Sequence, residues 1–254
     1  MNPILRLFKS LFKKINYDLI KIRPFDLSKN FPETSEFEKE LFNICSNYSM
    51  TSHDRMFSLM KSLEYVIQNN VEGDLVECGV WKGGNLIVFQ KYVEKFNLNK
   101  KIFAYDTFEG MTEPDSNDYD LSNNKKANIL LKNDNKKQSN IWGICSLEEV
   151  KKNILSNVKN IENIKFIKGP VEKTLDISSN LPVKISLLRL DTDWYSSTKK
   201  ELDVLYDKVA SGGIIIIDDY GHWAGSKKAV DEFFFNKYVW MHNVDYACRL
   251  IIKE

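Results

Sequence analysis

The stretch Asp74-Leu-Val-Glu-Cys-Gly-Val-Trp-Lys-Gly-Gly84 decides the fold. Its first half is a short apolar run, typical of a buried strand, and it ends at Gly79. The pair Gly83-Gly84 then begins an amphipathic pattern that extends to about Phe96, as expected for a helix. A strand, a glycine-rich turn and a helix in this order predict the first unit of a sheet with parallel strands.

The same alternation continues on both sides of this stretch. Further apolar runs typical of strands occupy 101–105, 164–167, 184–190 and 214–217. Amphipathic stretches that predict helices occupy 34–48, 51–69 and 198–209. We therefore expect an α/β fold with a Rossmann-like, doubly wound and mostly parallel sheet. Between two of these elements, residues 115–140 are rich in Asn, Lys, Asp and Ser, which predicts a long mobile loop that could close over a substrate.

Composition excludes several classes of protein. The chain has 254 residues with 43% hydrophobic and 28% charged residues, and Lys+Arg 36 against Asp+Glu 35 gives a net charge of +1. Such a balance provides no global attraction to nucleic acid, so we expect no nucleic-acid partner. The longest purely aliphatic run is 214–217, far below the roughly 20 residues of a membrane-spanning helix. The scattered cysteines form no C-x-x-C pair, which favours a reducing, cytoplasmic compartment.

Charge is uneven only at the N-terminus. Residues 1–24 contain six basic residues and one acidic residue, with apolar residues at helical spacing between them. This pattern predicts a basic amphipathic helix, and its lysines exclude a secretory signal. Two interpretations remain: the helix packs on its own domain or on a partner subunit in a homo-oligomer, which we favour, or it makes peripheral contact with anionic lipid at the inner face of a membrane.

Candidate ligand-binding residues follow the first two strands. In open α/β sheets, ligands bind outside the carboxyl ends of the strands. The turn with Gly79 and Gly83 lacks the G-x-G-x-x-G pattern of dinucleotide sites, and Glu77 would repel a pyrophosphate but tolerate the aminopropyl group and sulfonium of S-adenosylmethionine. Asp106 ends the next strand and could accept both hydroxyls of an adenosine ribose, or it could cap a turn. Methyl transfer is therefore favoured over hydride transfer.

Four carboxylates follow two later strands. Asp191 and Asp193 come after the strand 184–190, and Asp218 and Asp219 come after the strand 214–217. Two such pairs at one edge of a sheet would repel each other without a cation, and carboxylate oxygens suit Mg²⁺ or a similar divalent ion. The ion would stabilise an acceptor alkoxide, and one of the four acids could instead accept the hydroxyl proton.

These residues lie in motifs that resemble the macrocin O-methyltransferase family, which comprises Mg²⁺- and S-adenosylmethionine-dependent sugar O-methyltransferases. The similarity begins near Thr51 and extends to the C-terminus, so we expect a helical extension over 1–50 and a class I methyltransferase domain over 51–254. The motifs are Val76-Glu-Cys-Gly-Val-Trp-Lys-Gly-Gly84, Tyr105-Asp-Thr-Phe-Glu-Gly110, Leu190-Asp-Thr-Asp-Trp-Tyr-Ser196, Gly213-Ile-Ile-Ile-Ile-Asp-Asp-Tyr220 and Ala229-Val-Asp-Glu-Phe233.

The resemblance also implies roles for individual residues. Glu77 and the glycines Gly79 and Gly83 would contact the methionine end of the donor. Asp106 would hold the ribose, with Phe108 nearby. The implied metal ligands are Asp191, Asp218 and Asp219, and the implied base is Asp193.

Other interpretations stay open. His222 lies close to the metal motif and could replace Asp193 as the base. The D-x-D of Asp191 and Asp193 also occurs in metal-dependent glycosyltransferases that use a nucleotide sugar, and the chain could be a non-catalytic adaptor. We expect a saccharide acceptor, such as a glycan precursor or a glycosylated natural product. The sugar and the hydroxyl that is modified do not follow from the sequence.

Overall fold

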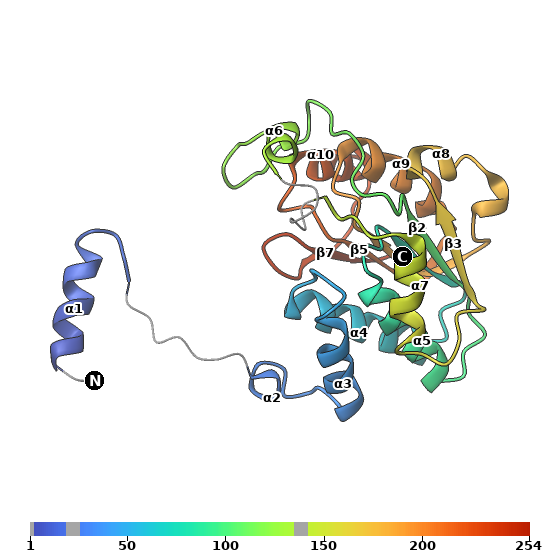
Figure 1. Ribbon diagram of the computed structural model, residues 1–254, viewed down its shortest axis with the longest axis horizontal. Coiled ribbons are helices and arrows are strands. Elements are labelled where there is room, and N and C mark those ends of the chain that lie inside the picture. The colour runs from blue at the N-terminus through green and yellow to red at the C-terminus, as the bar shows by residue number, and fades with distance from the viewer. Residues whose placement is uncertain (1–2, 19–25, 135–141) are drawn as a thin grey trace. The chain divides into compact units, whose positions relative to one another are not determined.

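A computed structural model of the chain describes residues 3–18, 26–134 and 142–254 (Figure 1). Internal contacts divide the chain into two units, Met1–Lys39 and Glu40–Glu254. The first unit contains α1 (Pro3–Lys13) and α2 (Leu27–Asn30), and the boundary falls within α3 (Glu36–Cys45). The basic helix expected over 1–24 forms only over Pro3–Lys13, as α1, and residues 14–18 form a turn and an irregular stretch instead of continuing it. Residues 1–2 and 19–24 of that prediction lie outside the described residues. No helix among the described residues is long and apolar enough to cross a membrane.

A seven-stranded sheet in the order β3-β2-β1-β4-β5-β7-β6 forms the centre of the second unit. Its strands are β1 (Asp74–Cys78), β2 (Ile102–Asp106), β3 (Ile164–Lys168), β4 (Ile185–Leu190), β5 (Val209–Ile217), β6 (Met241–Asn243) and β7 (Arg249–Ile252). The first five strands are parallel, and β7 pairs antiparallel with both β5 and β6. The expected Rossmann-like, mostly parallel sheet is confirmed.

Helices cover both faces of this sheet. They are α4 (His53–Gln68), α5 (Gly84–Lys95), α6 (Ala127–Lys132), α7 (Leu147–Leu155), α8 (Val171–Thr174), α9 (Tyr195–Leu205) and α10 (Ala224–Phe234), with short 3₁₀ helices at Ser178–Asn180 and Tyr206–Lys208. Figure 1 shows α8, α9 and α10 on one side of the strands and α4, α5 and α7 on the other. Because both faces are covered, all six residues of β4 are buried, which explains why that strand is a nearly continuous apolar run.

Four elements differ from the sequence-based expectation. The segment 115–140, expected as a loop, contains α6, because Ala127 and Leu131 pack in an aromatic cluster with Trp142, Trp194 and Trp223. Residues 135–141 of that segment lie outside the described part of the chain. Strand β5 begins at residue 209 rather than 214, and the short strands β6 and β7 were not predicted, since β6 is too short and polar to give a pattern.

The order of the strands creates a crevice beside β1. After β1 the chain adds β2 and β3 on one side of it, and then crosses over to add β4 and β5 on the other side. Ligand sites of open α/β sheets lie at such a switch point. Gly79 ends β1 there with a φ of +87°, and a Cβ at this position would lie 1.8 Å from the carbonyl oxygen of Asp191. The two central strand ends therefore approach each other as closely as only glycine permits.

Gly73, just before β1, provides a test of this packing. It has a φ of +106°, and an added Cβ would lie 2.6 Å from the backbone nitrogen of Ile185. We expect Gly73→Ala to lower the free energy of unfolding by about 3 kcal/mol, because both backbone strain and overpacking oppose it. Gly212 is the matched control, since its φ is +76° but the nearest atom to an added Cβ is 3.6 Å away. Urea unfolding should give a loss of only about 1 kcal/mol for Gly212→Ala, and equal losses would contradict this packing.

Candidate active site

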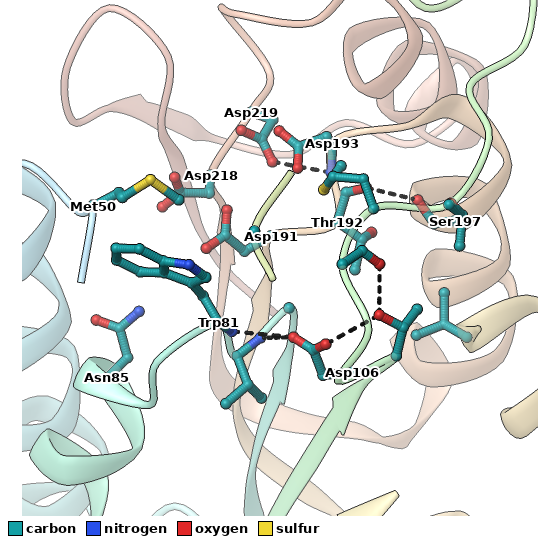
Figure 2. A pocket seen from close by; sticks show the side chains of 18 of the residues that line it. Met50, Trp81, Asn85, Asp106, Asp191, Thr192, Asp193, Ser197, Asp218 and Asp219 are labelled. Atoms are coloured by element: carbon teal, nitrogen blue, oxygen red, sulfur yellow. Dashed lines mark hydrogen bonds between the residues drawn. The ribbon is translucent and has the colours of Figure 1, made fainter. Parts of the chain in front are cut away.

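A cavity of about 440 Å³ opens at the carboxyl ends of β1, β2, β4 and β5 (Figure 2). Its lining includes Gly79 and the five aspartates singled out from the sequence, Asp106, Asp191, Asp193, Asp218 and Asp219. Both candidate bases contribute, because His222 also lines the cavity. Three of the expected cofactor residues, Glu77, Gly83 and Phe108, do not line it. The fold thus brings together residues that are far apart in the sequence.

The acidic cluster is a direct result of strand pairing. Leu190 and Ile217 are paired neighbours at the ends of β4 and β5, so the acids that follow them emerge side by side. Carboxylate oxygens of Asp191, Asp218 and Asp219 lie within 4.8 Å of one another. Oxygen ligands at this separation suit a hard divalent cation. The backbone N–H of Asp193 donates to Asp219 Oδ2 at 3.3 Å, which places the fourth acid against this cluster (Figure 2).

A buried arginine lies beneath the acidic cluster. Arg189 is 1% exposed, and its Nη1 donates to Glu77 Oε1 at 2.9 Å and to Asp191 Oδ2 at 2.6 Å. Its Nη2 donates to Asp218 Oδ1 at 2.6 Å. Sequence reasoning missed this residue, although one cation inside the apolar strand 184–190 was a usable signal, since arginine is rarely buried without a carboxylate partner.

A second arginine reaches the cluster from α4. Arg55 forms an ion pair with Asp218 through Nη1 and donates from Nε to Asp245 Oδ2 at 2.8 Å. Ser52 caps the start of the helix and also donates to Asp245, at 2.9 Å. These contacts join α4 to the end of β5 and to the turn before β7. The sequence gives no signal for these contacts, because Arg55 is a charged residue in the first turn of a predicted helix, where charged side chains are usually exposed.

Negative charge exceeds positive charge in this region. Six carboxylates, those of Glu77, Asp191, Asp193, Asp218, Asp219 and Asp245, surround the two guanidinium groups. Burial raises the pKa of Asp193 to about 8, and the charge of Asp191 adds to this effect. Burial also raises the pKa of Asp191 to about 6, although Arg189 opposes the shift, and burial with the charge of Asp193 raises the pKa of Asp219. The donor set therefore fits a divalent cation both in chemistry and in charge.

Glu77 lies beneath the cavity and does not line it. Its side chain is fully buried and accepts hydrogen bonds from Asn85 Nδ2 and Arg189 Nη1, both at 2.9 Å. Burial raises the pKa of Glu77 to about 8. The carboxylate therefore supports the floor of the cavity through Arg189 and Asn85. Its predicted contact with the donor stays a prediction.

Asp106 organises the turns at the other end of the cavity. Its Oδ2 accepts from the backbone N–H groups of Val80 at 2.7 Å and Trp81 at 3.1 Å (Figure 2). Its Oδ1 accepts from the backbone N–H of Phe108 at 2.6 Å. The turn-capping interpretation of Asp106 describes these contacts. Because the residue also lines the cavity, the predicted contact with a ribose stays a prediction.

Strained backbone is concentrated at this edge of the sheet. Among the described residues, four of the non-glycine residues with positive φ are asparagines, which tolerate this conformation. The others are Trp81 (φ +47°), Phe108 (+54°) and Asp193 (+66°), which follow β1, β2 and β4. Strain of this kind persists where surrounding contacts enforce it and is typical of functional sites.

Comparison with known proteins identifies the family. A sequence model of the macrocin O-methyltransferase (TylF) family matches residues 29–250. The chain belongs to this family. It is 32% identical over 188 residues to the demethyldecarbamoylnovobiocin O-methyltransferase of Streptomyces niveus. The matched region covers 73% of this chain and 67% of that protein. It is 28% identical over 175 residues to the 8-demethyl-8-(2,3-dimethoxy-alpha-L-rhamnosyl)-tetracenomycin-C 4'-O-methyltransferase of Streptomyces olivaceus, covering 68% and 62%. The match thus spans about two thirds of the length of these relatives.

Solved structures agree with membership of the macrocin O-methyltransferase family. The O-methyltransferase NovP superposes with a TM-score of 0.69 at 27% identity, over 81% of this chain and 82% of that chain. The calicheamicin methyltransferase CalS11 superposes with a TM-score of 0.57 over 92% and 99%, and at 18% identity it supports the fold alone. The family and the class I methyltransferase fold expected from the sequence are both confirmed, and the chain is an O-methyltransferase by family.

The buried Arg189 gives a prediction about stability. Arg189→Met removes the guanidinium from Glu77, Asp191 and Asp218 and leaves three carboxylates without this partner. We expect a loss of about 3–5 kcal/mol in the free energy of unfolding near pH 8. The loss should be smaller near pH 5, because the raised pKa values of Glu77 and Asp191 allow these groups to be protonated there.

An exposed ion pair provides the control for this measurement. Lys184 contacts Glu72 at 2.6 Å, and both side chains are at least half exposed. Lys184→Met should cost less than about 0.5 kcal/mol at either pH in the same urea unfolding experiment. Equal losses for the two variants, or a loss for Arg189→Met that does not depend on pH, would contradict the assigned role of Arg189.

Proposed function

We propose that this chain transfers the methyl group of S-adenosylmethionine to a hydroxyl of a saccharide, with Mg²⁺ held by Asp191, Asp218 and Asp219. The observation that carries the proposal is the carboxylate cluster, which opens into the cavity at the switch point of the sheet. Its excess negative charge matches a divalent cation, and membership of the O-methyltransferase family favours a methyl donor over a nucleotide sugar. The name of the Streptomyces olivaceus relative includes a rhamnosyl group, which supports a sugar acceptor.

Residues at different positions around the cavity would bind the donor, the metal ion and the acceptor. Asp106 and the turns it caps would receive the donor at the β1 and β2 side of the cavity, while the acids after β4 and β5 would face the acceptor. A bound Mg²⁺ would act as a Lewis acid that lowers the pKa of the acceptor hydroxyl. Asp193 would accept the hydroxyl proton as the oxygen displaces the sulfonium sulfur from the methyl carbon. A raised pKa suits Asp193 to this role, since a base with a pKa near neutrality can both accept and release a proton.

A single substitution tests the metal ligands. We expect Asp191→Asn to lower the rate of methyl transfer at least about a hundredfold, because the Lewis-acid contribution is worth several kcal/mol. Transfer to a panel of nucleotide sugars and glycosides would be measured by mass spectrometry, with and without Mg²⁺. Binding of S-adenosylhomocysteine, measured by calorimetry, should stay within about twofold of wild type, because the donor binds mainly through the β1 and β2 turns.

Asp231→Asn is the matched control for this substitution. Asp231 lies on α10, where it pairs with Lys227 at the surface, and we expect full activity from this variant. Full activity of the wild type in excess chelator would contradict the metal mechanism. Metal-dependent binding of a nucleotide sugar without any binding of S-adenosylhomocysteine would instead support the D-x-D glycosyltransferase alternative.

The raised pKa values predict how stability depends on pH without a cation. Asp191, Asp193 and Glu77 have pKa values of about 6, 8 and 8 in the folded state, against about 4 in an unfolded chain. Between about pH 4.5 and 8 the folded state therefore binds more protons than the unfolded state, and its stability falls as the pH rises. The three shifts together amount to about 5 kcal/mol between pH 6 and 8. We therefore expect Tm without divalent cation to fall by on the order of 10 °C over this range.

Added Mg²⁺ should reverse much of this loss. Its ligands must be deprotonated to bind, so the rise in Tm on adding Mg²⁺ should be larger at pH 8 than at pH 6. Differential scanning fluorimetry at both pH values measures the effect, and Asp219→Asn, which removes one expected ligand, should show little response. An equal rise at both pH values, or a full response from the variant, would rule out a cation at this cluster.

A further inference from the structure

The first unit of the chain carries an exposed apolar surface on α1. Phe8 is 50% exposed, Leu11 51% and Ile15 62%. Phe8 and Leu11 are three residues apart on one side of the helix, and Ile15 follows in the turn after the helix ends at Lys13. A helix of 11 residues is marginally stable in water unless its apolar side is covered. This side of α1 therefore requires an apolar partner.

The opposite side of α1 carries positive charge. Arg6, Lys9 and Lys13 repeat with the same helical spacing but are offset from the apolar side, and the first turn contains no acid. Lys14 follows, and the one nearby acid is Asp18, whose carboxylate lies 3.6 Å from Lys9 Nζ. Residues 1–24 as a whole have six basic residues and one acidic residue, whereas the rest of the chain has 30 basic and 34 acidic residues. Positive charge is thus segregated onto the segment that also exposes the apolar side.

We propose that α1 docks this chain on an anionic lipid surface, with Phe8, Leu11 and Ile15 inserted among the acyl chains and Arg6, Lys9 and Lys13 facing the headgroups. An anionic lipid interface provides an apolar layer that can cover the apolar side of α1 and negative headgroups that can contact its basic side. At 1.5 Å per residue the helix is about 16 Å long, so it lies in the plane of the interface. Pairing with α1 of a second copy would cover the apolar side but would leave the basic side without negative charge to contact.

The proposal concerns where the enzyme acts and does not depend on the reaction it catalyses. The experiment uses the full chain and unilamellar vesicles of phosphatidylcholine, with or without phosphatidylglycerol. We expect co-sedimentation with the anionic vesicles at least about tenfold stronger than with neutral ones, and a steep decrease between about 0.05 M and about 0.5 M NaCl. Absence of binding to anionic vesicles, or equal binding to both kinds, overturns the proposal.

An apolar variant tests the inserted side. The triple substitution Phe8→Ser, Leu11→Ser and Ile15→Ser should reduce vesicle binding at least about tenfold. Its matched control is Phe235→Ser with Tyr238→Ser, two aromatic residues of the second unit that are 83% and 98% exposed, and this variant should bind as wild type does. Unchanged circular dichroism melting curves would exclude unfolding as the cause. Retained vesicle binding by the triple variant overturns the proposal.

A basic variant tests the charged side. Arg6→Gln, Lys9→Gln and Lys13→Gln together should weaken binding to anionic vesicles about a hundredfold at low salt, from about fivefold for each charge, and leave any binding to neutral vesicles unchanged. Light scattering on the same variants tests the competing occupant. If the apolar variant dissociates an oligomer while vesicle binding persists, the surface belongs to a second copy and the lipid assignment is wrong. Methyl transfer to a soluble acceptor is a separate readout, so failure of the proposed reaction would leave this result intact.

Discussion

The guanidinium group of Arg189 is the contact on which the catalytic end of the sheet depends. From the carboxyl end of β4 it binds Glu77 on β1 and Asp218 after β5, and it also binds Asp191 in the turn that follows its own strand. One buried cation thus joins the three central strands at their carboxyl ends. Without it, the carboxylates would face each other in a region of low dielectric, where like charges repel strongly. The acidic cluster can form inside the fold because this residue is beneath it.

The geometry above Arg189 is held by backbone contacts rather than by loops that move freely. Gly79 brings the end of β1 against the carbonyl group of Asp191, and Asp106 fixes the turns that contain Trp81 and Phe108. Each of the three residues with unusual positive φ at this edge follows a different strand. The backbone strain is therefore distributed over the three connections that follow β1, β2 and β4. The cavity is shaped before a ligand binds, which reduces the entropic cost of ordering these connections on binding.

The sequence was sufficient to predict strands β1 to β5 and the acids that follow them, but not strands β6 and β7 or the arginines that contact the acids. Strands β1 to β5 are apolar runs that end in polar residues, so local pattern alone placed Asp191, Asp193, Asp218 and Asp219 at one edge. Arg55 contacts Asp218 across 163 positions of the chain, and no local pattern encodes such a contact. Glu77 illustrates the same limit, because its contact with Arg189 results from the pairing of β1 with β4 and could not be read from the local sequence.

The number of arginines decides what the cavity can hold. Two guanidinium groups lie on the protein side of the cluster, and both contact Asp218, which is buried. Asp191 keeps a side chain that is 30% exposed toward the cavity, and no ion pair to Asp193 or Asp219 occurs among the described residues. The uncompensated charge is therefore on the side that faces the cavity, where a third arginine would have removed it. The arginines orient the carboxylates from the protein side and leave negative charge on the side that faces the cavity. The arrangement therefore favours binding of a cation from the cavity over complete neutralisation by ion pairs within the protein.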